Sequence, residues 1–129
     1  MKGTLPHRYP FLMIDNIVDI KEGQSVKGYK YITHNEWFIS ETQNSMPHML
    51  IVEALAQLRA FVDTSDSNGL GFLSSLDGVQ FHGKAFPDNT VILHYEVVRN
   101  RRGFMLGKGT ATVDDQLIVT VKKLLIYKA

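Results

Sequence analysis

The fold is decided by residues 46–62, which read MPHMLIVEALAQLRAFV. Ser45 precedes this stretch and is a suitable N-cap, and Pro47 is tolerated only in the first turn of a helix. Apolar residues then follow on every side of the expected helix, which is typical of a buried helix. The stretch therefore predicts one long central helix, ended by the polar turn residues 64–69.

The rest of the chain has the pattern of antiparallel strands. Residues 11–32 predict two strands with a turn at 21–24. Later strands are expected at 72–81, 90–99, 104–113 and 116–127, and the last three are joined by turns at 101–103 and 114–115. Long strands joined by short hairpins, with one helix inserted early, predict an α+β fold in which a curved sheet wraps around a helix. No repeat or linker divides the 129 residues, so a single domain over residues 1–129 is expected.

Composition excludes several classes of function. The net charge of +1, from 14 basic and 13 acidic residues, argues against a nucleic-acid partner. The chain has no cysteine, which excludes disulfides, thiolate metal sites and a cysteine nucleophile. No histidine pair has metal-ligand spacing, so neither a metal nor another cofactor is expected. The start of the chain does not resemble a signal peptide, and no apolar run approaches the length of a membrane span, so a cytoplasmic protein is expected.

Glu53 is the carboxylate that stands out in the predicted helix, because the only other charge between positions 47 and 62 is that of Arg59. Burial disfavours the charged form of a carboxylate, and a carboxyl held partly neutral near pH 7 can donate or accept a proton in catalysis. Gln57 lies one turn further on and is expected to share a face and a hydrogen bond with Glu53. The alternative is a structural Glu53 satisfied by an arginine or a backbone amide.

Two further features are candidates for binding. His48 falls in the first turn of the predicted helix, where it either reaches a ligand at the helix N-terminus or simply caps the helix or faces solvent. Arg99, Arg101 and Arg102 gather at a predicted hairpin, where they form either a docking point for an acidic partner or a solvated turn.

Two long motifs carry a family resemblance. Residues 5–12 read LPHRYPFL and are followed by Ile14-Asp15, while Met46-Pro47 is followed by LIVEALAQ at residues 50–57. Both motifs resemble the beta-hydroxyacyl-acyl-carrier-protein dehydratases of fatty-acid biosynthesis, and residues 81–89 and 101–103 match the same family. The resemblance covers almost the whole chain. It implies the hot-dog fold, a long helix wrapped by a bent antiparallel sheet, in a homodimer or a trimer of dimers.

The resemblance also implies a reaction. In that family the helix carboxylate, which corresponds to Glu53, acts as an acid beside a histidine from the other subunit, in a hydrophobic tunnel at the subunit interface. The histidine removes a proton next to the thioester carbonyl, and the carboxyl group helps the hydroxyl leave as water. A backbone amide at the helix N-terminus binds the thioester oxygen, in agreement with the electrostatics of helix ends. The expected substrate is an acyl thioester of acyl carrier protein or coenzyme A, and the expected substrate-binding residues are Phe38, Met46, Pro47 and Gln57.

The chain departs from the family pattern just before the helix. The family has an aromatic residue and then Gly-His-Phe-Pro shortly before Met-Pro-Gly, whereas residues 37–48 here read WFISETQNSMPH. This segment is shorter by about two residues. When the two sequences are aligned on Phe38, Glu41 occupies the position of the catalytic histidine, and His48 replaces the glycine.

Three interpretations follow from this departure. The protein is a dehydratase in which Glu41 or His48 is the substitute base. Alternatively, it is a thioester hydrolase whose carboxylate activates water or attacks the thioester. The third possibility is a non-catalytic acyl-binding protein, either a sensor or the inactive partner of an active hot-dog paralogue in a heterodimer.

Overall fold

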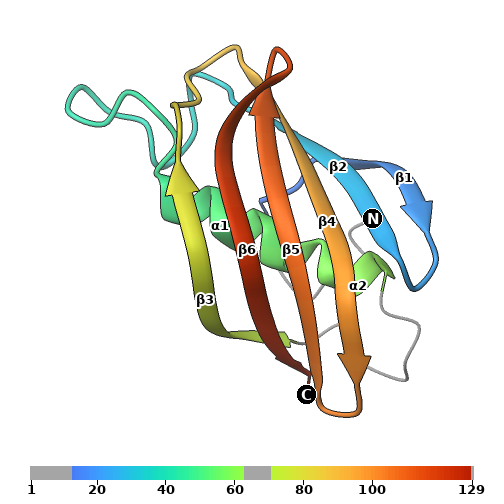
Figure 1. Ribbon diagram of the computed structural model, residues 1–129. Coiled ribbons are helices and arrows are strands. Elements are labelled where there is room, and N and C mark those ends of the chain that lie inside the picture. The colour runs from blue at the N-terminus through green and yellow to red at the C-terminus, as the bar shows by residue number, and fades with distance from the viewer. Residues whose placement is uncertain (1–12, 63–70, 129) are drawn as a thin grey trace.

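The computed structural model describes residues 13–62 and 71–128 and shows one helical layer against a curved antiparallel sheet (Figure 1). The described elements are β1 (Asn16–Lys21), β2 (Ser25–Tyr31), α1 (His48–Gln57), α2 (Arg59–Val62), β3 (Gly71–Phe81), β4 (Thr90–Arg101), β5 (Phe104–Val113) and β6 (Gln116–Lys128). The strands lie in the order β1-β2-β4-β5-β6-β3. This helix wrapped by a bent sheet is the predicted α+β, hot-dog arrangement.

The strands follow the sequence pattern closely. β5 has the predicted bounds, and those of β3, β4 and β6 differ from the prediction by at most two residues. The sequence pattern of β4 predicts that Val91, Leu93, Tyr95 and Val97 share one face. The first three are buried, and Val97 is partly buried against the core. Asp114 and Asp115 form the turn between β5 and β6, and both have positive φ, 52° and 64°, as two-residue hairpin turns require.

The central helix is shorter than predicted. α1 begins at His48, directly after Pro47, whose ψ of 135° is extended, and no side chain caps it. The predicted capping role of Ser45 is therefore wrong, because the chain becomes helical only after Pro47. The helix is interrupted at Leu58, whose N–H bonds to the carbonyls of both Ala54 and Leu55 and so tightens the last turn. The turn predicted at residues 64–69 lies outside the described residues.

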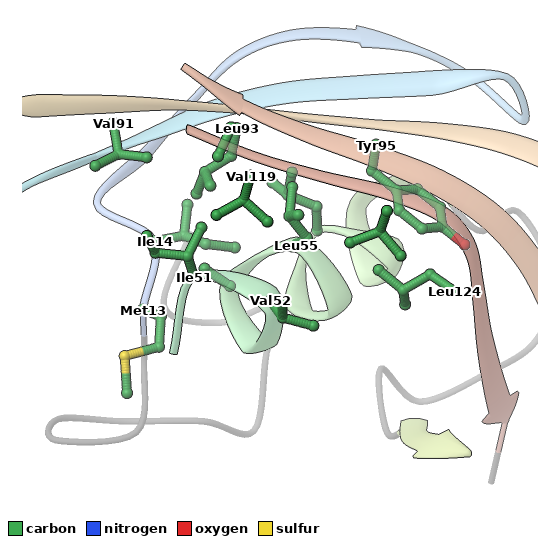
Figure 2. Close-up of a cluster of buried hydrophobic side chains, with 14 of the residues drawn as sticks. Met13, Ile14, Ile51, Val52, Leu55, Val91, Leu93, Tyr95, Val119 and Leu124 are labelled. Carbon is green, nitrogen blue, oxygen red and sulfur yellow. The ribbon is translucent and has the colours of Figure 1, made fainter. Parts of the chain in front are cut away.

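The core lies between α1 and the concave face of the sheet. Figure 2 shows Ile51 and Leu55 of α1 pointing toward side chains of the sheet, including Leu93 and Val119, and all four are buried. The prediction that the helix is buried on every side is wrong for this chain, since the side chain of Met49 is 54% exposed. Within the described residues, the sheet therefore covers one side of α1, and we call the opposite side, which carries the exposed Met49 and the partly buried Glu53, the open side. In the described ranges, no helix has the length and apolar character needed to cross a membrane.

Gly107 allows a buried tyrosine to lie flat against β5. A Cβ atom at Gly107 would collide with the ring of Tyr95, which is completely buried. The large ring occupies the space that a side chain at position 107 would need, so the absence of that side chain is a packing requirement.

We expect Gly107→Ala to lower the free energy of unfolding by about 1–3 kcal/mol, the usual cost of overpacking a core. Tyr95→Leu removes the ring atoms that the new methyl group would meet. The double variant should therefore lose less stability than the sum of the two single variants. Urea unfolding at one fixed protein concentration measures all three losses. Strictly additive losses would contradict the steric explanation.

Candidate active site

The start of α1 is fastened to the connection between β3 and β4. The backbone N–H of Met46 donates to the carbonyl of Ala85 at 2.8 Å. His48 Nε2 lies 2.6 Å from the carbonyl oxygen of Gly83. The N–H of Gly83 is in turn bonded to the carbonyl of Ile118 on β6, at 3.3 Å. The helix N-terminus is therefore held in a fixed position relative to the sheet.

The first backbone N–H groups of α1 remain available to a ligand. The N–H groups of Leu50 and Ile51 both donate to the carbonyl of Pro47, at 3.0 and 3.3 Å. Intrahelical bonding thus begins at Leu50, and the N–H groups of His48 and Met49 have no acceptor within the helix. Such groups, together with the helix dipole, stabilise negative charge on an oxygen atom.

Glu53 lies on the open side of α1, where it is only partly buried. Met49, one turn earlier, is 54% exposed, and Leu50 and Ala56 are partly buried apolar neighbours on the same side. In the part of the chain that the structure describes, no side chain or backbone group forms a hydrogen bond or ion pair with the carboxylate of Glu53. The structural alternative, a Glu53 satisfied by an arginine or an amide, therefore receives no support from these residues.

Gln57 has a different role from the one predicted. Its side chain is only 4% exposed, and its Oε1 accepts a hydrogen bond from the backbone N–H of Met13 at 2.9 Å. Gln57 thus points into the core and fastens the segment before β1 to the helix. The expected pairing of Gln57 with Glu53 on one face is wrong, because Glu53 faces the open side.

His48 is held as a rigid ring beside the helix N-terminus. Its imidazole stacks on the ring of Phe81 with a centroid distance of 4.4 Å and an interplanar angle of 7°. Its Nε2 bonds to Gly83, and the residue is partly buried. His48 therefore neither faces open solvent nor caps α1 with its side chain.

Glu41 lies in the loop between β2 and α1, which projects from the body of the protein beside the start of the helix (Figure 1). It occupies a tight turn in which Ser40 N–H donates to the carbonyl of Gln43 at 2.8 Å and Gln43 N–H donates to Ser40 Oγ at 3.1 Å. The side chain of Glu41 is exposed, and no interaction of its carboxylate occurs within the described ranges.

Three of the four predicted substrate-binding residues are buried in this chain. Phe38 is 7% exposed and packs edge-to-face against Trp37, with centroids 5.5 Å apart. Met46 is 2% exposed, and the side chain of Gln57 is buried and bonded to the N–H of Met13. Pro47 is partly exposed at the start of the helix.

A buried ion pair holds the base of the projecting loop, and the sequence analysis missed it. Lys30 Nζ lies 3.1 Å from Glu36 Oε2 and 3.6 Å from Asp15 Oδ1, and the side chains of Lys30 and Glu36 are 11% and 8% exposed. The signal was present in the sequence, because Lys30 has the same parity in its strand as buried Val26. A lysine on the inward face of a strand requires a carboxylate partner.

The pKa of Glu36 reflects this environment. Burial alone would raise the pKa of the carboxyl group, but a hydrogen bond from the Thr33 N–H, at 3.0 Å, and the ammonium of Lys30 outweigh that effect. The pKa of Glu36 is therefore lowered from its ordinary value of 4.5. The folded protein stabilises the charged form of Glu36.

A second, exposed cluster fastens the same loop to the connection between β3 and β4. Asp88 accepts a hydrogen bond from the Tyr31 hydroxyl at 2.9 Å, and His34 Nε2 lies 2.9 Å from its other carboxylate oxygen. The contacts with His34 and then Tyr31 lower the pKa of Asp88. The same hydrogen bond to Asp88 raises the pKa of Tyr31. Across residues 13–62 and 71–128, no three His, Asp or Glu side chains lie close enough to hold a metal ion.

Comparison of the amino-acid sequence with known proteins shows the family to which the chain belongs. Residues 5–122 match the family described as FabA-like domain. The chain is 48% identical over 113 residues to the uncharacterized protein YcsD of Bacillus subtilis, covering 88% of this chain and 87% of that protein. It is 38% identical over 128 residues to the 3-hydroxyacyl-[acyl-carrier-protein] dehydratase FabZ of the same organism, covering 95% and 91% of the two chains. The FabZ of Roseiflexus castenholzii is 41% identical over 122 residues, or 90% and 85% of the two chains.

Solved structures show the same fold. The dehydratase heterocomplex ApeI:P from Xenorhabdus doucetiae superposes with a TM-score of 0.82 at 16% identity, covering 98% of this chain and 89% of that one. A hypothetical thioesterase from Streptococcus pneumoniae, solved with coenzyme A, gives a TM-score of 0.69 at 9% identity, covering 88% and 84%. At these identities the likeness concerns the fold alone.

We expect the pH dependence of stability to expose the Glu36 contact. A carboxyl group whose pKa is lowered on folding stabilises the folded state above its ordinary pKa, and this contribution is lost as the pH falls through the lowered value. Glu36→Gln should therefore be less stable than the wild type at pH 7 and should lose less of its remaining stability between about pH 5 and pH 3. Urea unfolding across this range measures both effects. Glu22→Gln, in the exposed turn between β1 and β2, is the matched control. Parallel pH curves for wild type and Glu36→Gln would refute the contribution of this ion pair.

Proposed function

Because the chain belongs to the FabA-like domain family, we propose that it binds a 3-hydroxyacyl thioester beside the N-terminal half of α1 and catalyses its dehydration. The 3-hydroxyacyl group is carried by acyl carrier protein or coenzyme A. The observation that supports this proposal best is the carboxylate of Glu53, which is partly exposed among apolar neighbours and has no partner within the described part of the chain.

Glu53 has the properties that a general acid for this reaction needs. A carboxyl group without a structural partner is available to donate its proton to a departing hydroxyl group. Apolar surroundings such as Leu50 and Ala56 exclude water and strengthen the interaction with the substrate. The role of acid for the leaving group therefore belongs to Glu53 in this proposal.

The N-terminus of α1 is the proposed site of the thioester carbonyl. The N–H groups of His48 and Met49 lack acceptors within the helix, and the hydrogen bonds to Ala85 and Gly83 hold the helix start still. Fixed donors stabilise the negative charge that develops on a thioester oxygen when the neighbouring carbon loses a proton. Glu53 lies five residues further along the same helix, a rise of about 7.5 Å.

A second copy of the chain is the proposed partner that closes the site. β3 is an edge strand of 11 residues, and in the described structure its only neighbouring strand is β6. A long unpaired edge is a template for pairing with another strand. Two copies joined antiparallel through β3 would form a symmetric homodimer with one continuous sheet. The open side of α1, which the strands of the described sheet do not cover, would then face the tunnel between the subunits.

A non-catalytic role is the second candidate function, and one observation favours it. Glu41 stands at the position of the family's catalytic histidine, yet it is exposed at the tip of a shortened loop. A chain without a base would still bind an acyl thioester, alone or in a heterodimer with a hot-dog paralogue that supplies the missing histidine. A hydrolase would be distinguished from both by its product, because it releases the free thiol of the carrier.

We expect the purified protein to convert a 3-hydroxyacyl thioester into the enoyl thioester, and Glu53→Gln to lower the turnover number about 10²–10⁴-fold, the usual loss for a general acid. Absorbance of the enoyl thioester follows dehydration, and a thiol reagent follows hydrolysis in parallel. Glu22→Gln should keep full activity, because it lies in the turn between β1 and β2.

The other outcomes of this assay separate the remaining interpretations. Thiol release without enoyl product would favour the hydrolase. Thioester binding without either product would favour the non-catalytic partner or sensor. If calorimetry detects no binding of 3-hydroxyacyl thioesters on either carrier, the proposed ligand is wrong.

We expect Ser74→Pro to weaken the homodimer at least about tenfold. Ser74 lies at the register shift between Leu73 and Ser75, so a proline there disturbs the pairing with β6 less than elsewhere in β3. Proline lacks the backbone N–H, and its ring obstructs the outer edge of β3. A symmetric dimer contains this change twice, and each lost hydrogen bond costs about 1 kcal/mol. Sedimentation equilibrium measures the dissociation constant, with Ser74→Ala as the control and circular dichroism to verify folding. An unchanged dissociation constant would exclude this edge as the interface.

A further inference from the structure

The imidazole of His48 is fixed in both position and orientation. Its Nε2 is 2.6 Å from the carbonyl oxygen of Gly83, and its ring lies nearly parallel to that of Phe81, 4.4 Å away. Tilting the ring would break the stacking on Phe81, and a half-turn of the ring in its own plane would move Nε2 away from the carbonyl of Gly83. Side chains locked in this way are those that can present a reactive atom in one place.

The contact with Gly83 also determines which ring nitrogen is basic. A carbonyl oxygen only accepts hydrogen bonds, so Nε2 of His48 carries the hydrogen and donates it. A neutral imidazole has one N–H group, and its lone pair is therefore on Nδ1. Nδ1 is bonded to Cγ, which makes it the ring nitrogen nearer to the helix backbone. The basic atom is thus separated from the backbone of His48 by only Cβ and Cγ, at the start of α1.

We propose that Nδ1 of His48 is the base that removes the proton from C2 of the substrate. This inference rests on the proposed function, because it needs the thioester oxygen to be bound at the N–H groups of His48 and Met49. C2 is the carbon next to the thioester carbonyl, so an oxygen held at those groups brings the C2 proton to the same end of the helix. The base and the oxygen-binding amide then belong to one residue.

Glu41 is a weaker candidate for the same role. Its carboxylate is exposed at the tip of the turn formed by Ser40 and Gln43, where water competes for every hydrogen bond. A general base has to lie within hydrogen-bonding reach of the proton that it removes. His48 is instead attached to the helix end where the thioester carbonyl is proposed to lie, and its ring is already oriented.

The proposed step balances with the two residues alone. The C2–H bond breaks and its proton passes to Nδ1 of His48, while the electron pair forms the double bond between C2 and C3. The C3–O bond breaks, and the departing oxygen takes the proton of the Glu53 carboxyl group and leaves as water. The proton on His48 then returns through solvent to Glu53, which restores both groups. No metal, reductant or oxidant takes part.

The experiment uses His48→Gln and His48→Gly in the full chain. The amide N–H of glutamine can still donate to the Gly83 carbonyl, but glutamine has no basic nitrogen. We expect His48→Gln to lower the turnover number at least about 100-fold, with thioester affinity within a few-fold of wild type. His94→Gln is the matched control, because His94 is a partly buried histidine on β4 that faces away from α1 and should leave activity unchanged.

Exchange of the C2 proton in heavy water is the readout that a purely structural role would not change. Wild type and Glu53→Gln should exchange deuterium into C2, whereas His48→Gln should not. Free imidazole should restore exchange and enoyl formation to His48→Gly, because it fills the vacated space and supplies the base. If His48→Gln exchanges deuterium within threefold of wild type, or imidazole rescues neither reaction of His48→Gly, the assignment is wrong.

Failure of the proposed function would have a different signature. The wild-type protein would then form no enoyl product, whether or not it binds the thioester, and the proposed role of His48 would be wrong as well. If instead the wild type is active, Glu53→Gln is inactive and His48→Gln remains active, the proposed function stands and His48 is not the base.

Discussion

The structure depends on the close contact between α1 and the concave face of the sheet. Leu55, completely buried, lies over β5 at Gly109, where a Cβ atom would approach Leu55 Cδ1 to 3.1 Å. Because position 109 carries no side chain, the helix can lie close to the strand and bury its apolar side in one contiguous core. A side chain at position 109 would push the helix outward and open gaps between the two layers.

This contact also determines where a ligand can bind. The described sheet curves around one side of α1, and the opposite side of the helix carries Met49 and Glu53. The bonds from Met46 to Ala85 and from His48 to Gly83 then fix the helix along its axis. The N–H groups of His48 and Met49 and the carboxylate of Glu53 belong to the same helix, which the proposed reaction on one substrate requires.

The strands could be predicted from sequence because alternation and turn residues are local signals. Asp114-Asp115 and the alternating residues of β4 define their hairpins without reference to the rest of the chain. The helix start was misplaced because Ser45 has the right chemistry for a cap, but the extended conformation of Pro47 delays the helix. Full burial of the helix was predicted because composition does not distinguish a face covered by the same chain from a face left for a partner.

The site was predictable only in part, for a related reason. Glu53 stands out in sequence as a charge among apolar residues, whereas the anchoring of Glu36 to Lys30 and of His48 to Gly83 depends on residues brought together by folding. The separation of His48 from Gly83 along the chain, 35 residues, leaves no local pattern to detect. The alternation of buried and exposed residues in β2 was the one local pattern, and it indicated an inward-facing Lys30 rather than a residue of the candidate site.

The two departures from the family pattern make physical sense together. Loss of the loop histidine removes a base, and replacement of the glycine by His48 adds an imidazole at the helix end to which the thioester carbonyl is proposed to bind. An acceptor at one ring nitrogen of a histidine holds the hydrogen there and leaves the lone pair on the other nitrogen, and the Gly83 carbonyl is such an acceptor, 2.6 Å from Nε2 of His48. Phe81 supplies the second constraint, because its ring lies 4.4 Å away and almost parallel, and the stacking favours this orientation of the imidazole. With His48 as the proposed base, the shorter loop with its exposed Glu41 would have no catalytic group to place.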